Sequence, residues 1–110
     1  MENPKTALEL MESRYEAYKN GDIDYVKRTW DKKESKKINW VELIQWNNCV
    51  QWKELKILKV EKGEKLDKDG IVEFQGKYID KETGEEKIHY EISYFIKKGR
   101  KWYYKGYLNE

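Results

Sequence analysis

The chain has 110 residues, which is enough for one hydrophobic core and too few for two, so we expect a single domain over residues 1–110. Charged residues make up 40% of the chain, but five Trp, nine Tyr and two Phe bring far more apolar area than disordered proteins carry. The 23 basic and 21 acidic residues are interspersed and leave a net charge of only +2, which argues against a nucleic-acid partner.

Helices are predicted in the first part of the chain. Thr6 followed by Glu9 is a capping-box pattern, and apolar residues recur at three- and four-residue spacing over residues 8–18. Gly21 predicts the end of this helix, because glycine readily adopts the left-handed cap conformation. Asp22 can then cap a second helix.

A charged stretch runs from Lys27 to Lys37 and predicts a solvated loop, since charge runs usually face solvent. Asn39 can cap a third, short helix. The expected apolar positions of that helix are Trp40, Leu43, Ile44 and Trp46. Cys49 follows among apolar residues, and we expect it to be a small buried side chain. As the lone cysteine it excludes an intrachain disulfide and a cysteine cluster for zinc.

Strands are predicted in the second part, over residues 52–60, 71–79, 87–97 and 101–108. The turn signals between them are Asp69-Gly70, Thr83-Gly84 and Gly99. Short turns imply an antiparallel meander, and helices followed by such a sheet are typical of an α+β fold. There is no apolar run of membrane-spanning length and no signal-peptide core, so we expect a cytoplasmic protein without a membrane partner.

The third strand leaves its inward face open to two interpretations. Side chains alternate between the two faces of a strand. The even positions are Ile88, Tyr90, Ile92, Tyr94 and Ile96, whereas the odd positions are His89, Glu91, Ser93 and Phe95. Periodicity alone predicts that the even, more apolar set points to the core.

Three segments resemble the middle domain of YchJ-type proteins. They are TALELMESRYEAYKNGDIDYVKRTW (6–30), GIVEFQGKY (70–78) and EISYFIKKGRKWYYKG (91–106), which together cover most of the chain. The resemblance implies a nuclear transport factor 2-like cone, in which about three N-terminal helices pack on a curved four-stranded antiparallel sheet. It also implies that Glu91, Ser93 and Phe95 face the concave side, against the apolar count. Many YchJ-type proteins carry Cys-rich SEC-C segments that bind zinc. This sequence has none, so we expect no metal and no other cofactor.

A carboxylate inside the cone needs a partner, because an unpaired buried charge is costly. Arg14 is the natural partner of Glu91, since an Arg fork can grip a carboxylate from the covering helix. The candidate ligand-binding residues are Arg14, Tyr15, Tyr18, Glu91, Ser93, Trp102 and Tyr104. Two interpretations stay open: a structural ion pair, or a pocket in which Glu91 acts as acid or base or Arg14 holds an anionic ligand. His89 lacks a Cys, Asp or second His at metal-ligand spacing, and the sequence places no nucleophile or orienting acid for it, so it is expected to be an ordinary strand residue.

If Glu91 faces inward, an apolar set lies on the outer sheet face. Its members are Tyr90, Ile92, Tyr94 and Tyr103, and they predict a homodimer or the docking of another chain. We therefore expect a non-catalytic binding or protein-interaction module, with a possible small-molecule ligand in the cone. The alternative is a small-molecule enzyme, similar to isomerases, dehydratases or hydrolases of cone folds, that uses Glu91 as acid or base.

Overall fold

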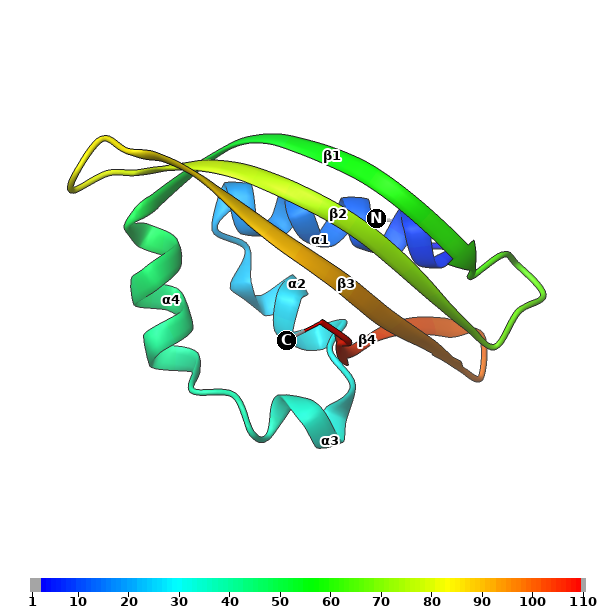
Figure 1. Ribbon diagram of the computed structural model, residues 1–110. Coiled ribbons are helices and arrows are strands. Elements are labelled where there is room, and N and C mark those ends of the chain that lie inside the picture. Colours follow the sequence, from blue (N-terminus) through cyan, green and yellow to red (C-terminus); the bar gives the residue numbers. More distant parts are fainter. Residues whose placement is uncertain (1–2, 110) are drawn as a thin grey trace.

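Four helices precede a four-stranded sheet in this protein, whose computed structural model describes residues 3–109. In chain order the elements are α1 (Ala7–Asn20), α2 (Ile23–Arg28), α3 (Lys32–Ser35), α4 (Trp40–Asn48), β1 (Val50–Lys62), β2 (Asp69–Asp80), β3 (Glu86–Lys98) and β4 (Lys101–Tyr107). Figure 1 shows α1 beneath the curved sheet, with α2 and α3 below it and α4 at one end. The predicted α+β class is confirmed, with four helices where about three were expected. Within residues 3–109, no helix has the length and apolar character that crossing a membrane requires.

Side-chain caps define where the helices begin. The Thr6 hydroxyl accepts a hydrogen bond of 3.1 Å from the Glu9 amide, and Gly21 ends α1 in the left-handed conformation with φ of 75°. Asp22 and Asn39 cap α2 and α4 in the same way, each accepting from the amide three residues on. All three predicted helix starts are confirmed, because capping depends only on neighbouring residues.

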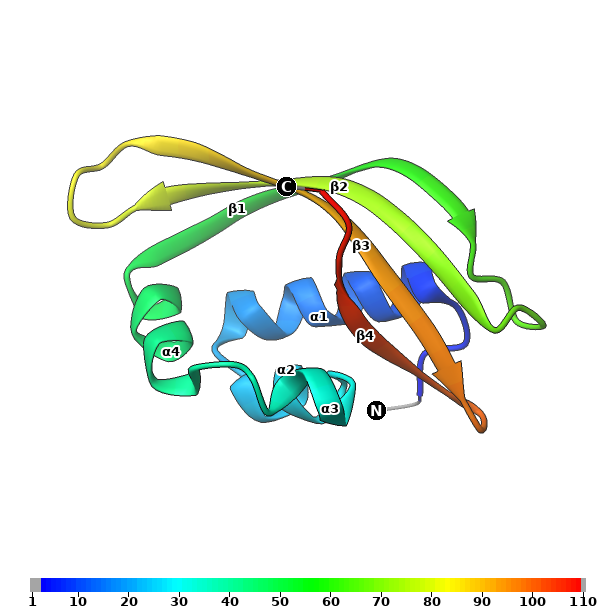
Figure 2. The same cartoon turned by 60° about the horizontal axis from the view of Figure 1, so that its bottom comes forward.

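The strands pair in the order β1-β2-β3-β4, and every neighbouring pair is antiparallel. The predicted meander is therefore confirmed, and each strand lies within two residues of its expected range. Two register shifts interrupt the β1–β2 pairing, one between Trp52 and Glu54 and one between Ile57 and Lys59. Such bulges bend a strand and increase its twist. Figure 2 shows the resulting sheet arching over α1.

The face of the third strand that points toward the helices is the less apolar one, which the apolar count did not favour. Glu91 and Ser93 of β3 pair with Phe74 and Val72 of β2, so these four side chains share the concave face. The even positions lie outside, where Ile88 is 56% exposed and Tyr90 is 38% exposed. The prediction from periodicity alone is wrong, and Glu91 lies on the side that the family resemblance implies.

The main core lies between α1 and the concave face of the sheet. Its buried members are Ala7, Leu10, Met11, Tyr15, Val72, Phe74, Phe95, Trp102 and Tyr104. A smaller cluster of Ala17, Tyr25 and Val26 packs α2 against α1. Tyr25 also exchanges a 2.6 Å hydrogen bond with the Ser13 hydroxyl, which joins the two helices at a polar point.

The charged stretch between Lys27 and Lys37 is not simply a solvated loop. It contains α3 and the buried Asp31, whose carboxylate accepts hydrogen bonds from Lys98 at 2.6 Å and Lys105 at 3.2 Å. These two lysines lie on β3 and β4, so the stretch is tied to the edge of the sheet. A helix of a single turn has no periodicity from which it can be predicted.

Helix α4 packs differently from its apolar pattern. Its one buried side chain is Asn47, which donates to the Tyr18 carbonyl at 2.9 Å and accepts from Trp52 Nε1 at 3.0 Å. Ile44 and Trp46, expected to be its apolar face, are exposed. Cys49 is also exposed, against expectation, because it is the cap residue where the chain turns from α4 into β1.

Candidate functional site

A cavity of about 560 Å³ lies between the helices and the concave face of the sheet. Its wall is mostly aromatic and includes Trp30, Trp46, Trp52, Phe74 and Tyr107. Trp46 and Tyr107 are also exposed to solvent, so they stand at its mouth. Small-molecule sites in proteins typically measure roughly 300–1,000 Å³ and have apolar walls with a few polar groups. The cone therefore has both the size and the lining of a ligand site.

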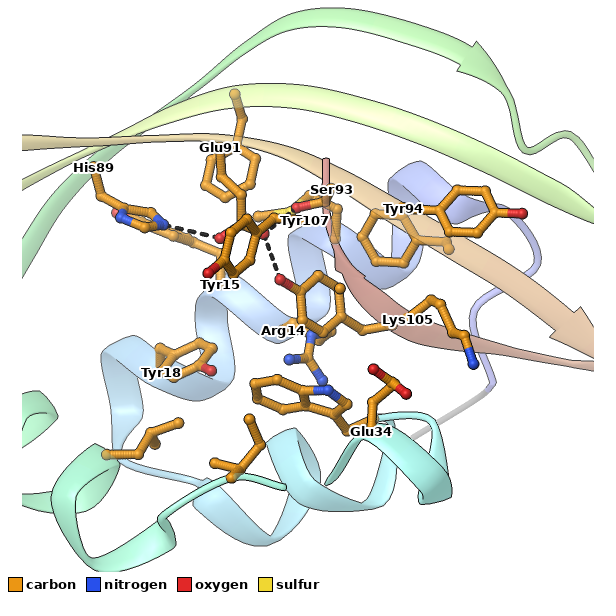
Figure 3. Close-up of a pocket in the computed structure, with 18 of the residues that line it drawn as sticks. Arg14, Tyr15, Tyr18, Glu34, His89, Glu91, Ser93, Tyr94, Lys105 and Tyr107 are labelled. Atoms are coloured by element: carbon orange, nitrogen blue, oxygen red, sulfur yellow. Dashed lines mark hydrogen bonds and ion pairs between the residues drawn. The ribbon is translucent and has the colours of Figure 1, made fainter. Parts of the chain in front are cut away.

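Glu91 projects into this cavity, where three donors surround its carboxylate (Figure 3). The hydroxyls of Ser93 and Tyr104 donate to Oε2 at 2.5 and 2.7 Å, and His89 Nε2 lies 3.0 Å from Oε1. His89, Glu91 and Ser93 are alternate residues of β3, so the pleat of the strand directs all three to the concave side. Tyr104 reaches the same carboxylate from the neighbouring strand β4.

The hydrogen bonds hold Glu91 in its ionised form. Burial by itself would raise the pKa of Glu91, but the bonds from His89, Ser93 and Tyr104 outweigh burial and place that pKa below its ordinary value. Burial, together with the Glu91 charge, raises the pKa of Tyr104, which keeps that phenol protonated as a donor. Glu91 can therefore accept a proton at neutral pH, but it has none to donate.

Arg14 does not form the expected ion pair with Glu91. Its Nη1 donates instead to the Val26 carbonyl and to the Thr29 hydroxyl, both at 2.8 Å. These acceptors belong to the end of α2, which lies against α1 and is closer to the guanidinium than β3 is. Tyr104 contacts both charged groups, because its ring centroid is 4.4 Å from Arg14 Cζ and its hydroxyl binds Glu91. The structural ion pair considered from the sequence is therefore absent among residues 3–109.

Two further tyrosines of α1, Tyr15 and Tyr18, line the cavity as expected for their helix face. Burial raises the pKa of both phenols, so both stay protonated at neutral pH. The Tyr15 hydroxyl is buried and finds no hydrogen-bond partner within residues 3–109. Buried hydroxyls are normally satisfied, so this one is an exception, and the charges that act on its pKa are those of Glu16 and Glu54.

The structure separates one candidate from the site and adds another. Trp102 is buried at the other end of the core, where its Nε1 donates to the Lys5 carbonyl at 3.1 Å, and it does not line the cavity. His89 does line it, and its Nε2 lies 3.0 Å from the Glu91 carboxylate, a contact that the sequence interpretation did not include. Its position two residues before Glu91 was the available signal, because residues i and i+2 share a face.

The outer-face patch consists of Tyr90, Ile92, Tyr94 and Tyr103. It is less apolar than the sequence suggests, because the Tyr90 hydroxyl donates to Glu73 and the Tyr94 hydroxyl donates to Asp69 at 3.1 Å. Tyr94 also borders the cavity. Over residues 3–109, no group of three or more His, Cys, Asp or Glu side chains is arranged to hold a metal ion.

Known relatives share this domain. A UPF0225 protein of Geobacter sulfurreducens is 35% identical over 99 residues, which cover 90% of this chain and 60% of that protein. One from Chromobacterium violaceum is 34% identical over 99 residues, covering 90% of this chain and 70% of the relative. The chain thus spans about three fifths of the length of the Geobacter relative.

Solved structures show the same architecture. The solution structure of a SEC-C motif containing protein from Rhodopseudomonas palustris superposes with a TM-score of 0.87 and 27% identity, covering 99% of this chain and 82% of that one. The crystal structure of a sec-c motif containing protein from Psychrobacter arcticus has a TM-score of 0.79 at 20% identity, over 94% of this chain and 60% of that one, which shows the fold alone. The family model described as "YchJ, middle NTF2-like domain" matches residues 6–106. The chain therefore belongs to the YchJ family and contains its middle NTF2-like domain.

Proposed function

We propose that this domain is a non-catalytic module that binds a small, mainly apolar molecule inside its cone. The observation that carries the proposal is the aromatic cavity of about 560 Å³ that reaches Glu91. A cone closed by a Glu91–Arg14 ion pair would have favoured a purely structural role. Instead, space and polar groups lie together at one end of an apolar chamber, as is typical of small-molecule sites.

The polar end of the cavity would orient the ligand. Glu91 and His89 project together from the inner face of β3 into the cavity (Figure 3). The rest of the wall is ring surface, which favours a flat or aromatic molecule through stacking and edge contacts. We therefore expect a ligand with one polar end and one ring system.

Two neighbouring residues of α4 allow a matched test of cavity occupancy. Leu43 lines the cavity, whereas Ile44 beside it is exposed. Leu43→Trp would fill part of the chamber, and Ile44→Trp would add the same side chain outside it. We expect aromatic fragments to raise the melting temperature and shift the indole NMR signals of the wild type and Ile44→Trp, but not of Leu43→Trp. A panel of fragments that perturbs no variant, or all three equally, would refute the proposal.

The contact between His89 and Glu91 favours one alternative function, a small-molecule enzyme. An ionised carboxylate beside an imidazole can orient the ring, which is how many general bases are held. In this alternative, Glu91 acts as a base, directly or through His89, because its lowered pKa leaves it without a proton to donate. Fragments that bind would be incubated with the protein and followed by NMR for chemical change. Turnover lost in Glu91→Gln with binding retained would support the enzyme, and unchanged fragments would leave only the binding module.

The outer-face patch carries a separate proposal about partners: a homodimer formed across this face of the sheet. Ile88 and Tyr90 are the exposed apolar side chains that support it. Sedimentation at micromolar concentration should show a dimer that dissociates in Tyr90→Lys, and a monomer at all concentrations would rule it out. We also propose a cytoplasmic location, which fractionation of cells that produce the protein would test.

A further inference from the structure

In the part of the chain that the structure describes, Arg14 is a buried cation without an anionic partner. Its side chain is only 4% exposed, and no carboxylate within residues 3–109 lies at ion-pair distance from it. Both of its hydrogen bonds leave from Nη1 and go to neutral acceptors, the Val26 carbonyl and the Thr29 hydroxyl. No further hydrogen bond from the guanidinium is formed among these residues, although the neutral Tyr18 phenol lies beside it. Burying an unpaired charge is costly, so the protein retains this arrangement at the expense of its stability.

Contacts inside the protein offset only part of that cost. The guanidinium lies between two rings, with Cζ 5.0 Å from the centroid of Trp30 and 4.4 Å from that of Tyr104. Such cation–π contacts are favourable but weaker than a charged hydrogen bond. Burial lowers the pKa of Arg14, and the neighbouring Tyr18, Tyr104 and Glu91 only partly counter it. The unmet requirement is for a negatively charged acceptor.

Glu91 does not supply that acceptor. Its two oxygens already receive hydrogen bonds from His89, Ser93 and Tyr104, and it stands on the far side of the Tyr104 hydroxyl from Arg14. The other cations in the cavity wall are already paired. Lys37 lies 3.3 Å from Glu34, and Lys105 lies 3.2 Å from Asp31. Arg14 is thus the one cation of the wall, as far as residues 3–109 describe it, whose charge is free for a ligand.

The phenol of Tyr18 lies beside Arg14 in the cavity wall (Figure 3). Burial raises the pKa of Tyr18, so this phenol is protonated at neutral pH and can donate a hydrogen bond. A guanidinium and a phenol at one end of an aromatic chamber need a ligand that brings acceptors. A carboxylate fits best, because its two oxygens match the Arg fork.

Building on the proposed ligand-binding role, we infer that the cone binds an aromatic monocarboxylate, with its carboxylate on Arg14 and its ring between Trp30, Trp46 and Trp52. The single negative charge follows from Glu91, whose own carboxylate would repel a second one placed deeper in the cavity. A cationic ligand held by the aromatic wall is disfavoured, because Arg14 would repel it and Glu91 already has three donors.

Three probes with the same ring separate these possibilities. 1-Naphthylacetate, 1-naphthylacetamide and 2-(1-naphthyl)ethylammonium carry a negative, a neutral and a positive end, and calorimetric titration gives the Kd of each. We expect the carboxylate to bind about tenfold more tightly than the amide, and the ammonium to bind weakest. Equal Kd values for carboxylate and amide, or tightest binding of the ammonium, would overturn the inference and leave the proposed ligand-binding function standing. Binding of none of the three would overturn both.

Variants then locate the carboxylate. Arg14→Lys keeps the charge without the fork, and we expect it to lose most of the preference for carboxylate over amide. Because Arg14 also holds Val26 and Thr29, Tyr18→Phe provides a second variant, which removes the hydroxyl beside the guanidinium and leaves both of these bonds in place. It should lower the carboxylate-to-amide ratio as well. Lys37→Gln, at a paired lysine of the same wall, is the matched control and should leave the ratio unchanged. A ratio that falls in Lys37→Gln but not in Tyr18→Phe would place the anion at the rim and overturn the inference.

Discussion

The hydroxyl of Tyr104 donates a 2.7 Å hydrogen bond to the carboxylate of Glu91. The face of the same tyrosine ring lies against Arg14. This neutral side chain therefore contacts both Arg14 and Glu91, which do not contact each other. This arrangement keeps Glu91 ionised and leaves Arg14 without a counter-ion among residues 3–109. It also leaves open the space that a direct ion pair would have closed. The chemistry available to the cone depends on this one tyrosine.

Removing the Tyr104 hydroxyl should destabilise the protein without removing the ring. Tyr104→Phe leaves the contacts with Arg14 and Phe95 in place but takes one of three donors from a buried carboxylate. We expect the free energy of unfolding in urea to fall by about 1–3 kcal/mol, as for other hydrogen bonds to charged groups. Tyr107→Phe, at an exposed tyrosine of the same strand, should change it by less than about 0.5 kcal/mol. Equal losses in the two variants would contradict the role given to Tyr104.

Asp31 should make the stability of the protein depend on acidic pH. Hydrogen bonds from Lys98, opposed by burial and supported by Lys105, lower the pKa of this carboxyl from 3.8 to about 2. A carboxyl with a lowered folded-state pKa adds stability above its unfolded-state pKa. That contribution is lost as the pH falls from 3.8 toward about 2.

The measurement is the free energy of unfolding of wild type and Asp31→Asn across this pH range. At neutral pH the variant should be less stable by about 1–3 kcal/mol, and the difference should shrink as the wild-type carboxylate becomes protonated. Glu12→Gln changes an exposed carboxylate of α1 and serves as the control, with no comparable difference expected. A constant gap between wild type and Asp31→Asn at every pH would show that the lysines do not act on Asp31 as a charge.

Local signals in the sequence predicted much of the fold, because they act between neighbouring residues. The caps at Thr6, Asp22 and Asn39 and the turn signals between strands needed no knowledge of the rest of the chain. Alternation in the third strand told which residues share a face but not which face is inside. That choice is made by β2, where Phe74 and Val72 stand opposite Glu91 and Ser93.

The candidate site was harder to predict than the fold, because it depends on the distances between elements far apart in the sequence. Arg14 is on the expected face of α1, but α2 folds back beside it and offers nearer acceptors than Glu91 does. His89 was assigned to the wrong role because its acid partner lies two residues away along the same strand, on the same face. Trp102 lies on the inner face of β4, as expected, but too far along the strand to reach the cavity.

Gly70 should tolerate no side chain. A Cβ built there would lie 2.5 Å from Gly63 Cα and 3.2 Å from Ala7 Cβ, where the β1–β2 connection meets the start of α1. The Ala7 amide donates to the Gly63 carbonyl at 2.9 Å, so the backbone cannot move aside without losing this bond. We expect Gly70→Ala to lower the free energy of unfolding by about 3 kcal/mol.

Gly84→Ala is the control for Gly70→Ala. Gly84 has open space around it and φ of 76°, so a side chain there meets only the strain of a left-handed backbone, about 1 kcal/mol. Chemical denaturation of both variants compares the two costs directly. A smaller loss in Gly70→Ala than in Gly84→Ala would mean that the Gly63–Gly70 contact is looser than the structure places it.

Cys49 should react as an accessible thiol in the folded protein. It caps α4 at the surface, whereas Val50 beside it is buried. We expect one equivalent of Ellman's reagent to be consumed under native conditions at a rate close to that in denaturant. Cys49→Ser should change the free energy of unfolding by less than about 0.5 kcal/mol. Protection of the thiol until the protein unfolds would instead support the burial expected from the sequence.

The single buried amide of α4 has a consequence for kinetics. Asn47 fastens this helix to α1 through Tyr18 and to the sheet through Trp52, while Leu43 and Trp46 of the same helix border the chamber. The Asn47 side chain therefore sets the position of α4 at the mouth of the cavity. Replacing Asn47 would change the association and dissociation rates of a ligand, although the side chains that contact the bound ligand would be the same.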